Sequence, residues 1–200
     1  MLFQDYSHNL LPIGGELYYC KSIFNEQESR LFLDELITSI PWKQEPIMMF
    51  GKSIMQPRLT ALYGNEGMSY GYSGIRMPAT IWTNTLLLIK DRVEQITQTS
   101  FNVALLNRYR DANDSMGWHR DNEKELGMQP VIASVSFGAA RAFQIRPYKT
   151  KEVPHTICLD SGSLLLMKGD MQTYWEHQLP KSRQSSGTRI NITFRKVLEF

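Results

Sequence analysis

The segment Arg189–Arg195 reads RINITFR and decides the fold class. Its polar and apolar residues alternate strictly, which is the pattern of a β-strand with one polar and one apolar face. Two interpretations of the polar face stay open: an edge strand with a solvated face, or a barrel strand whose polar face points inward to a charged ligand. In the second case, Arg189 and Arg195 could hold the two ends of a short dicarboxylate through charge-assisted hydrogen bonds.

Strand-like runs continue on the N-terminal side of this segment, back to residue 101. They are short and separated by turn signals such as Asp160-Ser161-Gly162, which is typical of a sandwich or barrel of roughly eight strands. In the first run, Asn107 and Tyr109 lie two residues apart, so one strand face offers an amide and a phenol to a carboxylate. The predicted runs cover residues 101–109, 131–137, 142–146, 155–159, 163–167 and 188–197.

Two helices are predicted before these strands, following a short strand at 16–22. The first helix begins at a capping box formed by Asn25 and Glu28 and ends before Pro41. The second is predicted at about 79–99, where apolar residues recur at helical spacing. Residues 43–78 are rich in Gly, Met and Tyr, and loops with short hairpins are predicted there. The methionines would either fill gaps or form a mobile apolar lid over a planar ligand.

Composition is that of an ordinary globular chain. Its 200 residues are 42% hydrophobic and 21% charged, which excludes a disordered protein, a collagen and a coiled coil. No apolar run approaches the roughly 18 residues of a membrane span, and the N-terminus lacks the basic region of a secretory signal. The two cysteines are expected to be free thiols in a reducing compartment. Residues 141–200 hold 10 basic and 5 acidic side chains, which suits either a polyanionic partner or an unevenly charged surface.

A candidate metal site combines His119 and Asp121, in an H-x-D motif, with His177. Two imidazoles and one carboxylate can hold Fe(II) and leave positions open for a co-substrate and O2. Residues i and i+2 of a strand point to the same side, which suits the H-x-D spacing. The motif arises by chance in roughly one such sequence in six, so it gains weight only together with the arginines of residues 189–195.

Over roughly residues 40–198, the sequence resembles the AlkB family of Fe(II)/2-oxoglutarate dioxygenases and is most similar to its short DNA-repair branch. Each matching block is common by itself, but here all of them occur in the family's order. The blocks are Phe50-Gly51-Lys52, Pro57-Arg58, Tyr63-Gly64, Tyr70-Gly71-Tyr72-Ser73-Gly74, Asn107-Arg108-Tyr109, His119-Arg120-Asp121, residues 133–138 and Arg189–Arg195.

The resemblance implies one domain over residues 1–200. The fold class would be α+β and mainly β: a double-stranded β-helix (jelly-roll) core, two N-terminal supporting helices and a Gly/Met/Tyr-rich lid. Residues 1–42 would form an N-terminal strand and helix, 43–78 the nucleotide-recognition lid, and 79–200 a helix and the catalytic barrel.

The resemblance also implies the residues of the site. His119, Asp121 and His177 would bind Fe(II) as the catalytic centre, with 2-oxoglutarate and O2 as co-substrates. Arg189 would pair with the distal carboxylate of 2-oxoglutarate, and Arg195 would lie near its keto-acid end. The co-substrate pocket would be completed by Asn107, Tyr109, Asn191 and Thr193. The substrate would be bound by Phe50, Gly51, Lys52, Arg58, Tyr70, Gly71, Tyr72, Ser73, Asn122 and Glu123.

The implied activity is oxidative demethylation of N-alkylated bases, such as N1-methyladenine and N3-methylcytosine, flipped out of DNA. Asn122 stands where duplex-repairing relatives often carry an acid, and an amide cannot pair with the positive charge of such a base. Three other functions stay open: an RNA demethylase, a 2-oxoglutarate hydroxylase of a protein or small molecule, and a catalytically silent barrel that binds nucleic acid. The protein is expected to be a monomer inside the cell, without membrane association. It would be cytoplasmic if bacterial and nuclear if eukaryotic.

Overall fold

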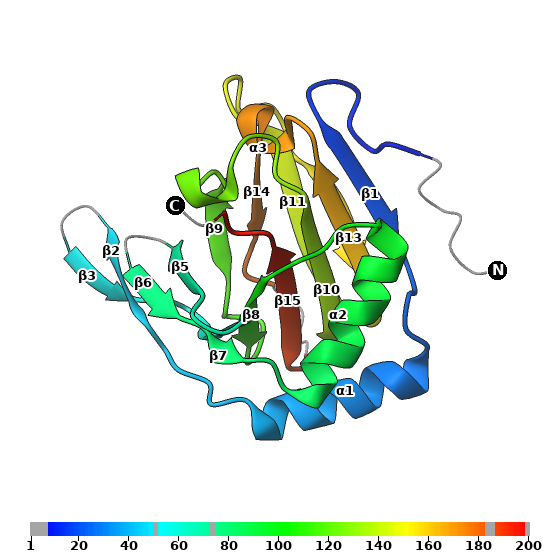
Figure 1. The fold of residues 1–200 in the computed structure, drawn as a ribbon. Helices are drawn as coiled ribbons and strands as arrows, with labels where there is room; N and C mark the ends of the chain where they lie inside the picture. The colour runs from blue at the N-terminus through cyan, green and yellow to red at the C-terminus, as the bar shows by residue number, and fades with distance from the viewer. Residues whose placement is uncertain (1–7, 50–51, 73–74, 183–186, 199–200) are drawn as a thin grey trace.

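Two mainly antiparallel sheets form the centre of the molecule, and two helices cover one face of the larger sheet (Figure 1). The structure is a computed structural model, and it describes residues 8–49, 52–72, 75–182 and 187–198. The prediction of an α+β, mainly β fold is confirmed by the order of elements. No helix within these residues is long and apolar enough to cross a membrane.

The larger sheet has seven strands, all antiparallel to their neighbours except β7, which pairs in parallel with β4. Its central strand is the segment of residues 189–195, in which polar and apolar residues alternate. The order is β1 (Glu16–Cys20), β13 (Ser163–Lys168), β10 (Ile132–Gly138), β15 (Arg189–Arg195), β8 (Val103–Tyr109), β4 (Leu59–Gly64) and β7 (Thr80–Ile81).

The smaller sheet has four antiparallel strands and faces part of the larger one. Apolar side chains from both sheets, such as Ile145 of the smaller and Leu165 of the larger, pack into one buried cluster. The order is β12 (His155–Leu159), β11 (Arg141–Pro147), β14 (Trp175–Leu179) and β9 (Met116–His119).

The burial of β15 decides between the two interpretations of its polar face. All seven of its residues are buried, and the strand lies between β10 and β8. Ile190, Ile192 and Phe194 pack with the helices in the largest apolar cluster, while the polar side chains line a cavity between the sheets. The edge-strand interpretation is therefore wrong, because β15 has a hydrogen-bonded neighbour on each side.

The helices α1 (Glu26–Ser39) and α2 (Asn84–Thr97) pack on the outer face of the larger sheet. The capping box of α1 is confirmed, since Asn25 accepts from the Glu28 amide and Glu28 accepts from the Asn25 amide. Helix α2 begins about five residues later than the predicted 79, because residues 80–81 pair with β4 and Thr83 caps the helix. Two short turns complete the helical elements, α3 (Met171–Tyr174) and η1 (Lys124–Leu126).

The segment 43–78 contains two hairpins and one strand of the larger sheet. The hairpins are β2 (Pro46–Met49) with β3 (Lys52–Met55), and β5 (Ser69–Tyr72) with β6 (Ile75–Pro78). Figure 1 shows the β2–β3 hairpin projecting from the body of the molecule. The prediction of short hairpins is confirmed, but β4 pairs with β8 along its whole length. The segment therefore contributes a strand to the larger sheet as well as two hairpins.

Candidate metal and co-substrate site

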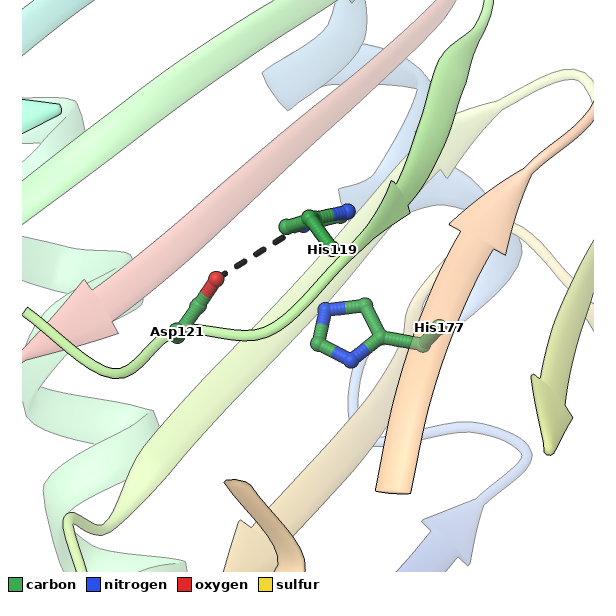
Figure 2. A group of neighbouring side chains, drawn as sticks. All are labelled: His119, Asp121 and His177. Carbon is green, nitrogen blue, oxygen red and sulfur yellow. Dashed lines mark ion pairs between the residues drawn. The ribbon is translucent and has the colours of Figure 1, made fainter. Parts of the chain in front are cut away.

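Three side chains converge at one end of the smaller sheet (Figure 2). His119 is the last residue of β9, and His177 lies opposite it on the neighbouring β14. Asp121 follows in the loop beyond β9, so only the histidine of the H-x-D motif belongs to the strand. One potential ligand atom from each residue lies within 4.8 Å of the others. The structure thus brings together the three residues that the sequence predicted as metal ligands.

The two imidazoles are suited to bind a metal. His119 Nδ1 lies 2.8 Å from the carbonyl oxygen of Gly117, which leaves Nε2 directed to Asp121 at 3.6 Å. His177 Nδ1 is buried and has no hydrogen-bond partner among the described residues. Burial lowers the pKa of both histidines, that of His177 to about 3. Both rings are therefore neutral at pH 7, the form that coordinates metals.

We call the three candidate ligands His119, Asp121 and His177 the metal set. The carboxylate of Asp121 belongs to this set and also binds Arg195. Its Oδ1 faces His119, while its Oδ2 accepts from Arg195 Nη2 at 2.5 Å and from Nε at 3.2 Å. Burial favours the protonated acid, but the positive charge of Arg195 outweighs it and holds the pKa of Asp121 well below its usual range. The group is thus an ionised carboxylate, which together with two imidazoles forms the set typical of Fe(II) oxygenases.

A cavity beside the metal set is lined by polar side chains of β8, β10 and β15. Asn191 donates to the Ser134 hydroxyl at 2.7 Å and accepts from the Thr193 hydroxyl at 2.9 Å, so these groups hold one another in place. Arg189 and Arg195 both line the cavity. Its lining also includes Asn107, Tyr109, Asn191, Thr193 and the three candidate metal ligands.

Arg189 is the group in this cavity that lacks a full set of partners. Its side chain is 2% exposed and packs over the Tyr109 ring, with 5.2 Å from Cζ to the ring centroid. Nη2 donates to the Ser136 hydroxyl at 2.9 Å, but the buried Nε has no partner among the described residues. Burial lowers the pKa of Arg189 to about 10, so the group stays charged at pH 7. A buried guanidinium with an unpaired donor fits a carboxylate ligand.

Arg58 contacts Asn107, one of the residues that line this pocket. It precedes β4, is 2% exposed, and donates from Nε to Asn107 Oδ1 at 2.7 Å. The sequence grouped Arg58 with the substrate-binding residues, but the structure places its guanidinium against the side chain of a residue predicted to bind 2-oxoglutarate. Its predicted contact with the substrate stays a prediction.

The side of the site toward the β5–β6 hairpin is formed by Tyr70 and Glu123. Tyr70 on β5 is 1% exposed, and the Arg195 guanidinium lies 5.2 Å from its ring centroid. Burial raises the pKa of both Tyr70 and Glu123. The negative charge of Asp121 raises the pKa of both groups further. Neither the Tyr70 hydroxyl nor Glu123 Oε2 has a hydrogen-bond partner among the described residues, although both are buried. Unsatisfied groups of this kind are typical of a binding pocket.

The remaining predicted substrate residues are placed less fully. Gly71 donates its amide to Glu125, and Asn122 is exposed. Phe50, Gly51 and Ser73 lie outside the described residues. For Lys52 and Tyr72, only the strand position is described. The roles proposed for these five residues therefore stay predictions.

Sequence reasoning missed several groups that support the site. Gln172 accepts from the Asp121 amide at 2.9 Å, and the Phe143 ring stacks on His177 with 5.3 Å between centroids. Ser134 and Ser136 bind Asn191 and Arg189. Their alternation in an otherwise apolar strand was a usable signal, whereas nothing local marked Gln172.

The fold and site together define an Fe(II)/2-oxoglutarate-dependent dioxygenase: three candidate metal ligands, two neutral and one anionic, lie beside a cavity whose two buried arginines suit a dicarboxylate. Residues 16–195 match the family model described as the 2OG-Fe(II) oxygenase superfamily. The solved structure named "The structure of OsALKBH1" matches with a TM-score of 0.64 over 94% of this chain and 100% of that chain. Its identity is 15%, so it supports the jelly-roll fold alone.

Curated relatives resolve the family further. The chain is 41% identical to "Alpha-ketoglutarate-dependent dioxygenase alkB homolog 3" of Homo sapiens, over 96% of this chain and 70% of that protein. It is 37% identical to "DNA oxidative demethylase ALKBH2" of Arabidopsis thaliana, over 92% of this chain and 67% of that protein. The chain belongs to the AlkB family of the 2OG-Fe(II) oxygenase superfamily. Fe(II), 2-oxoglutarate and O2 are accordingly its cofactor and co-substrates.

Proposed function

We propose that this chain is an oxidative demethylase that repairs N-alkylated bases, such as N1-methyladenine and N3-methylcytosine, in DNA. The observation that carries the proposal is the pair formed by Tyr70 and Glu123: the buried Tyr70 hydroxyl and the buried Oε2 of Glu123 lack a hydrogen-bond partner of good geometry among the described residues, and the charge of Asp121 acts on both groups. A methylated adenine or cytosine carries a positive charge and an exocyclic amine. The carboxylate of Glu123 and the phenol of Tyr70 can accept from that amine, and the carboxylate offsets the charge. Relatives named DNA oxidative demethylase support the same substrate class.

The residues of the chain divide the work of this reaction. His119, Asp121 and His177 would hold the iron, and Arg189 would hold the far carboxylate of 2-oxoglutarate. When bound, iron with 2-oxoglutarate and O2 supplies hydroxylation of the N-methyl carbon, after which formaldehyde leaves, the base is restored, and succinate and CO2 are released. Tyr70 and Glu123 orient the base so that its methyl group faces the metal. Arg195 keeps Asp121 ionised and oriented throughout.

A methyl group on the pairing edge of a base lies inside the duplex, so the base must be flipped out at a cost of a few kcal/mol. The β2–β3 hairpin projects from the molecule (Figure 1). Phe50 follows β2 in the sequence and lies outside the described residues, and an aromatic residue at this point of the sequence suits the role of a wedge that fills the vacated stack. We infer that this hairpin contacts the duplex beside the flipped base.

One chain carries every part of this site, so we propose that the protein acts as a monomer. Cys20 and Cys158 form no disulfide with each other. Unoxidised cysteines suit a reducing compartment, so we also propose an intracellular location.

The test compares one N1-methyladenine in otherwise identical single-stranded DNA and RNA, with unmodified DNA as control. Formaldehyde release that is faster from DNA supports the proposal. Faster release from RNA would favour the RNA demethylase, and release from neither strand would refute a nucleobase substrate. The Glu123→Gln variant tests the carrying observation, because it removes the negative charge. Its kcat/KM should fall more for cationic N1-methyladenine than for neutral N3-methylthymine.

A further inference from the structure

One carboxylate, that of Glu125, joins the loop after the metal ligands to the β5–β6 hairpin. Glu125 lies in η1, and its Oε1 accepts from the Gly71 amide of β5 at 2.5 Å. Its Oε2 lies 3.8 Å from Nη1 of Arg76 on β6. The Glu125 side chain is only 15% exposed, whereas that of Arg76 is 69% exposed. The short contact to the backbone amide is therefore the main link, and the ion pair adds little.

The sequence and backbone around this contact leave room for it. A Cβ atom on Gly71 would lie 3.3 Å from Glu125 Oε1, so a glycine there lets the carboxylate approach the strand closely. The backbone of Glu125 is also held, because its carbonyl oxygen accepts from the Leu198 amide, in the segment after β15, at 2.7 Å. The neighbouring Leu126 packs with Tyr70 in one buried cluster.

Gly71 directly follows Tyr70, and the loop that carries Glu125 also carries Asp121 and Glu123. Asp121 thus belongs to the metal set, Glu123 lies at Tyr70, and Glu125 contacts the β5–β6 hairpin. Movement of β5 relative to the loop would displace Tyr70 from the metal ligands. Glu125 hydrogen-bonds this loop to the backbone of β5 through the Gly71 amide.

We propose that Glu125 is a positioning residue, which fixes the distance between the base held at Tyr70 and the metal centre. This inference rests on the proposed function. Without Glu125, 2-oxoglutarate turnover continues but is uncoupled from demethylation, because a displacement of about 1 Å at the reacting carbon can cost about 100-fold in rate. The metal and co-substrate sites are untouched, so the KM for 2-oxoglutarate stays at the wild-type value.

The experiment measures succinate and formaldehyde from a single-stranded oligonucleotide with one N1-methyladenine, for wild type, Glu125→Ala and Glu125→Gln. The glutamine keeps an oxygen that can accept from Gly71 but loses the charge. Glu66→Ala is the matched control, since Glu66 is an exposed acid that lines a surface pocket together with Arg76 and Glu125. Hydrogen exchange of the Gly71 amide, read against amides of α2, reports the link without any need for activity.

We expect the formaldehyde-to-succinate ratio to fall about 10-fold or more in Glu125→Ala, with an intermediate value in Glu125→Gln and no change in Glu66→Ala. Exchange of the Gly71 amide should accelerate in the same order. Wild-type exchange of the Gly71 amide in Glu125→Ala would overturn the inference. Faster exchange of this amide with a wild-type formaldehyde-to-succinate ratio would also overturn it. If wild type releases no formaldehyde, the proposed function fails instead, while the exchange measurement still tests the link.

Discussion

Arg195 Nη2 donates to Asp121 Oδ2 at 2.5 Å, and both side chains are almost fully buried. The strand that lines the co-substrate pocket therefore also holds the carboxylate of the metal set. One oxygen of Asp121 is committed to Arg195, while the other faces His119. The pair couples the two halves of the site, since a change at Arg195 alters the metal set as well as the pocket.

Replacing Arg195 should destabilise the metal-free protein. In Arg195→Met, Asp121 becomes a buried carboxylate without a partner, which costs about 3 kcal/mol of unfolding free energy. A divalent cation can compensate that charge, so Mn(II) should restore more stability in this variant than in wild type. Denaturant unfolding with and without Mn(II) measures both quantities, and Arg195→Lys should lose less. An unchanged free energy of unfolding in metal-free Arg195→Met would contradict the importance of the pair.

Arg189 should control the requirement for 2-oxoglutarate. Its buried Nε has no partner among the described residues, so a bound carboxylate is the partner that the pocket lacks. Arg189→Met should weaken 2-oxoglutarate binding about 100-fold, since a buried charged ligand group loses its counterion. Arg189→Lys should recover part of the affinity, because an ammonium lacks the bidentate fork. Calorimetric titration of the metal-loaded protein measures this, and wild-type affinity in Arg189→Met would refute the assignment.

Asp114 should make stability depend on pH. Asp114 is buried and accepts hydrogen bonds from the Arg110 amide and guanidinium at 2.8–2.9 Å. Arg110 directly follows β8, which ends at Tyr109. Burial acts to raise the pKa of Asp114, but the hydrogen bonds and charge of Arg110 outweigh it and lower the pKa. A lowered pKa stabilises the fold above the ordinary value near 4, and this stabilisation is lost as pH falls through the folded value.

Asp114→Asn should therefore be about 2 kcal/mol less stable than wild type at pH 7, and the difference should shrink toward pH 2. Denaturant unfolding across this range is the measurement. Asp91→Asn, at an exposed position on α2, is the control. A difference that is independent of pH would show that the carboxylate charge of Asp114 contributes nothing.

The fold was largely readable from the sequence, whereas the strands that carry the metal ligands were not. The capping box of α1 and the strand at 155–159 are local patterns, and both appear as predicted. In the smaller sheet, the strands that were missed are β9 and β14. Each contains a histidine at an inward position where a core strand would have an apolar residue, so the requirements of the site interrupt the hydrophobic pattern.

Long-range contacts were beyond any single-sequence pattern. The late start of α2 follows from pairing between β7 and β4. The contact between Glu125 and Gly71 joins residues 54 positions apart. The predicted partner of Asp121 was the metal alone, and the sequence contained no signal that Arg195 would bind the same carboxylate. Such pairs are set by the packing of the sheets and not by spacing along the chain.

Phe50 should separate duplex from single-strand repair. If it fills the vacated stack, Phe50→Ala should lose about 5- to 150-fold in duplex repair, since base–aromatic stacking is worth about 1–3 kcal/mol. Repair of single strands, where no vacancy needs filling, and succinate production without nucleic acid should stay at wild-type rates. Equal losses on both strand forms together with a lower melting temperature would assign Phe50 to packing instead.

The most direct test of the central claim is the stoichiometry of products from single-stranded DNA with one N1-methyladenine. We expect one formaldehyde per succinate, with dependence on both Fe(II) and 2-oxoglutarate, and conversion of the lesion to adenine. His177→Ala should abolish both products, because it removes a metal ligand. Succinate without formaldehyde, or an unchanged lesion after prolonged turnover, would contradict the claim that this site demethylates DNA bases.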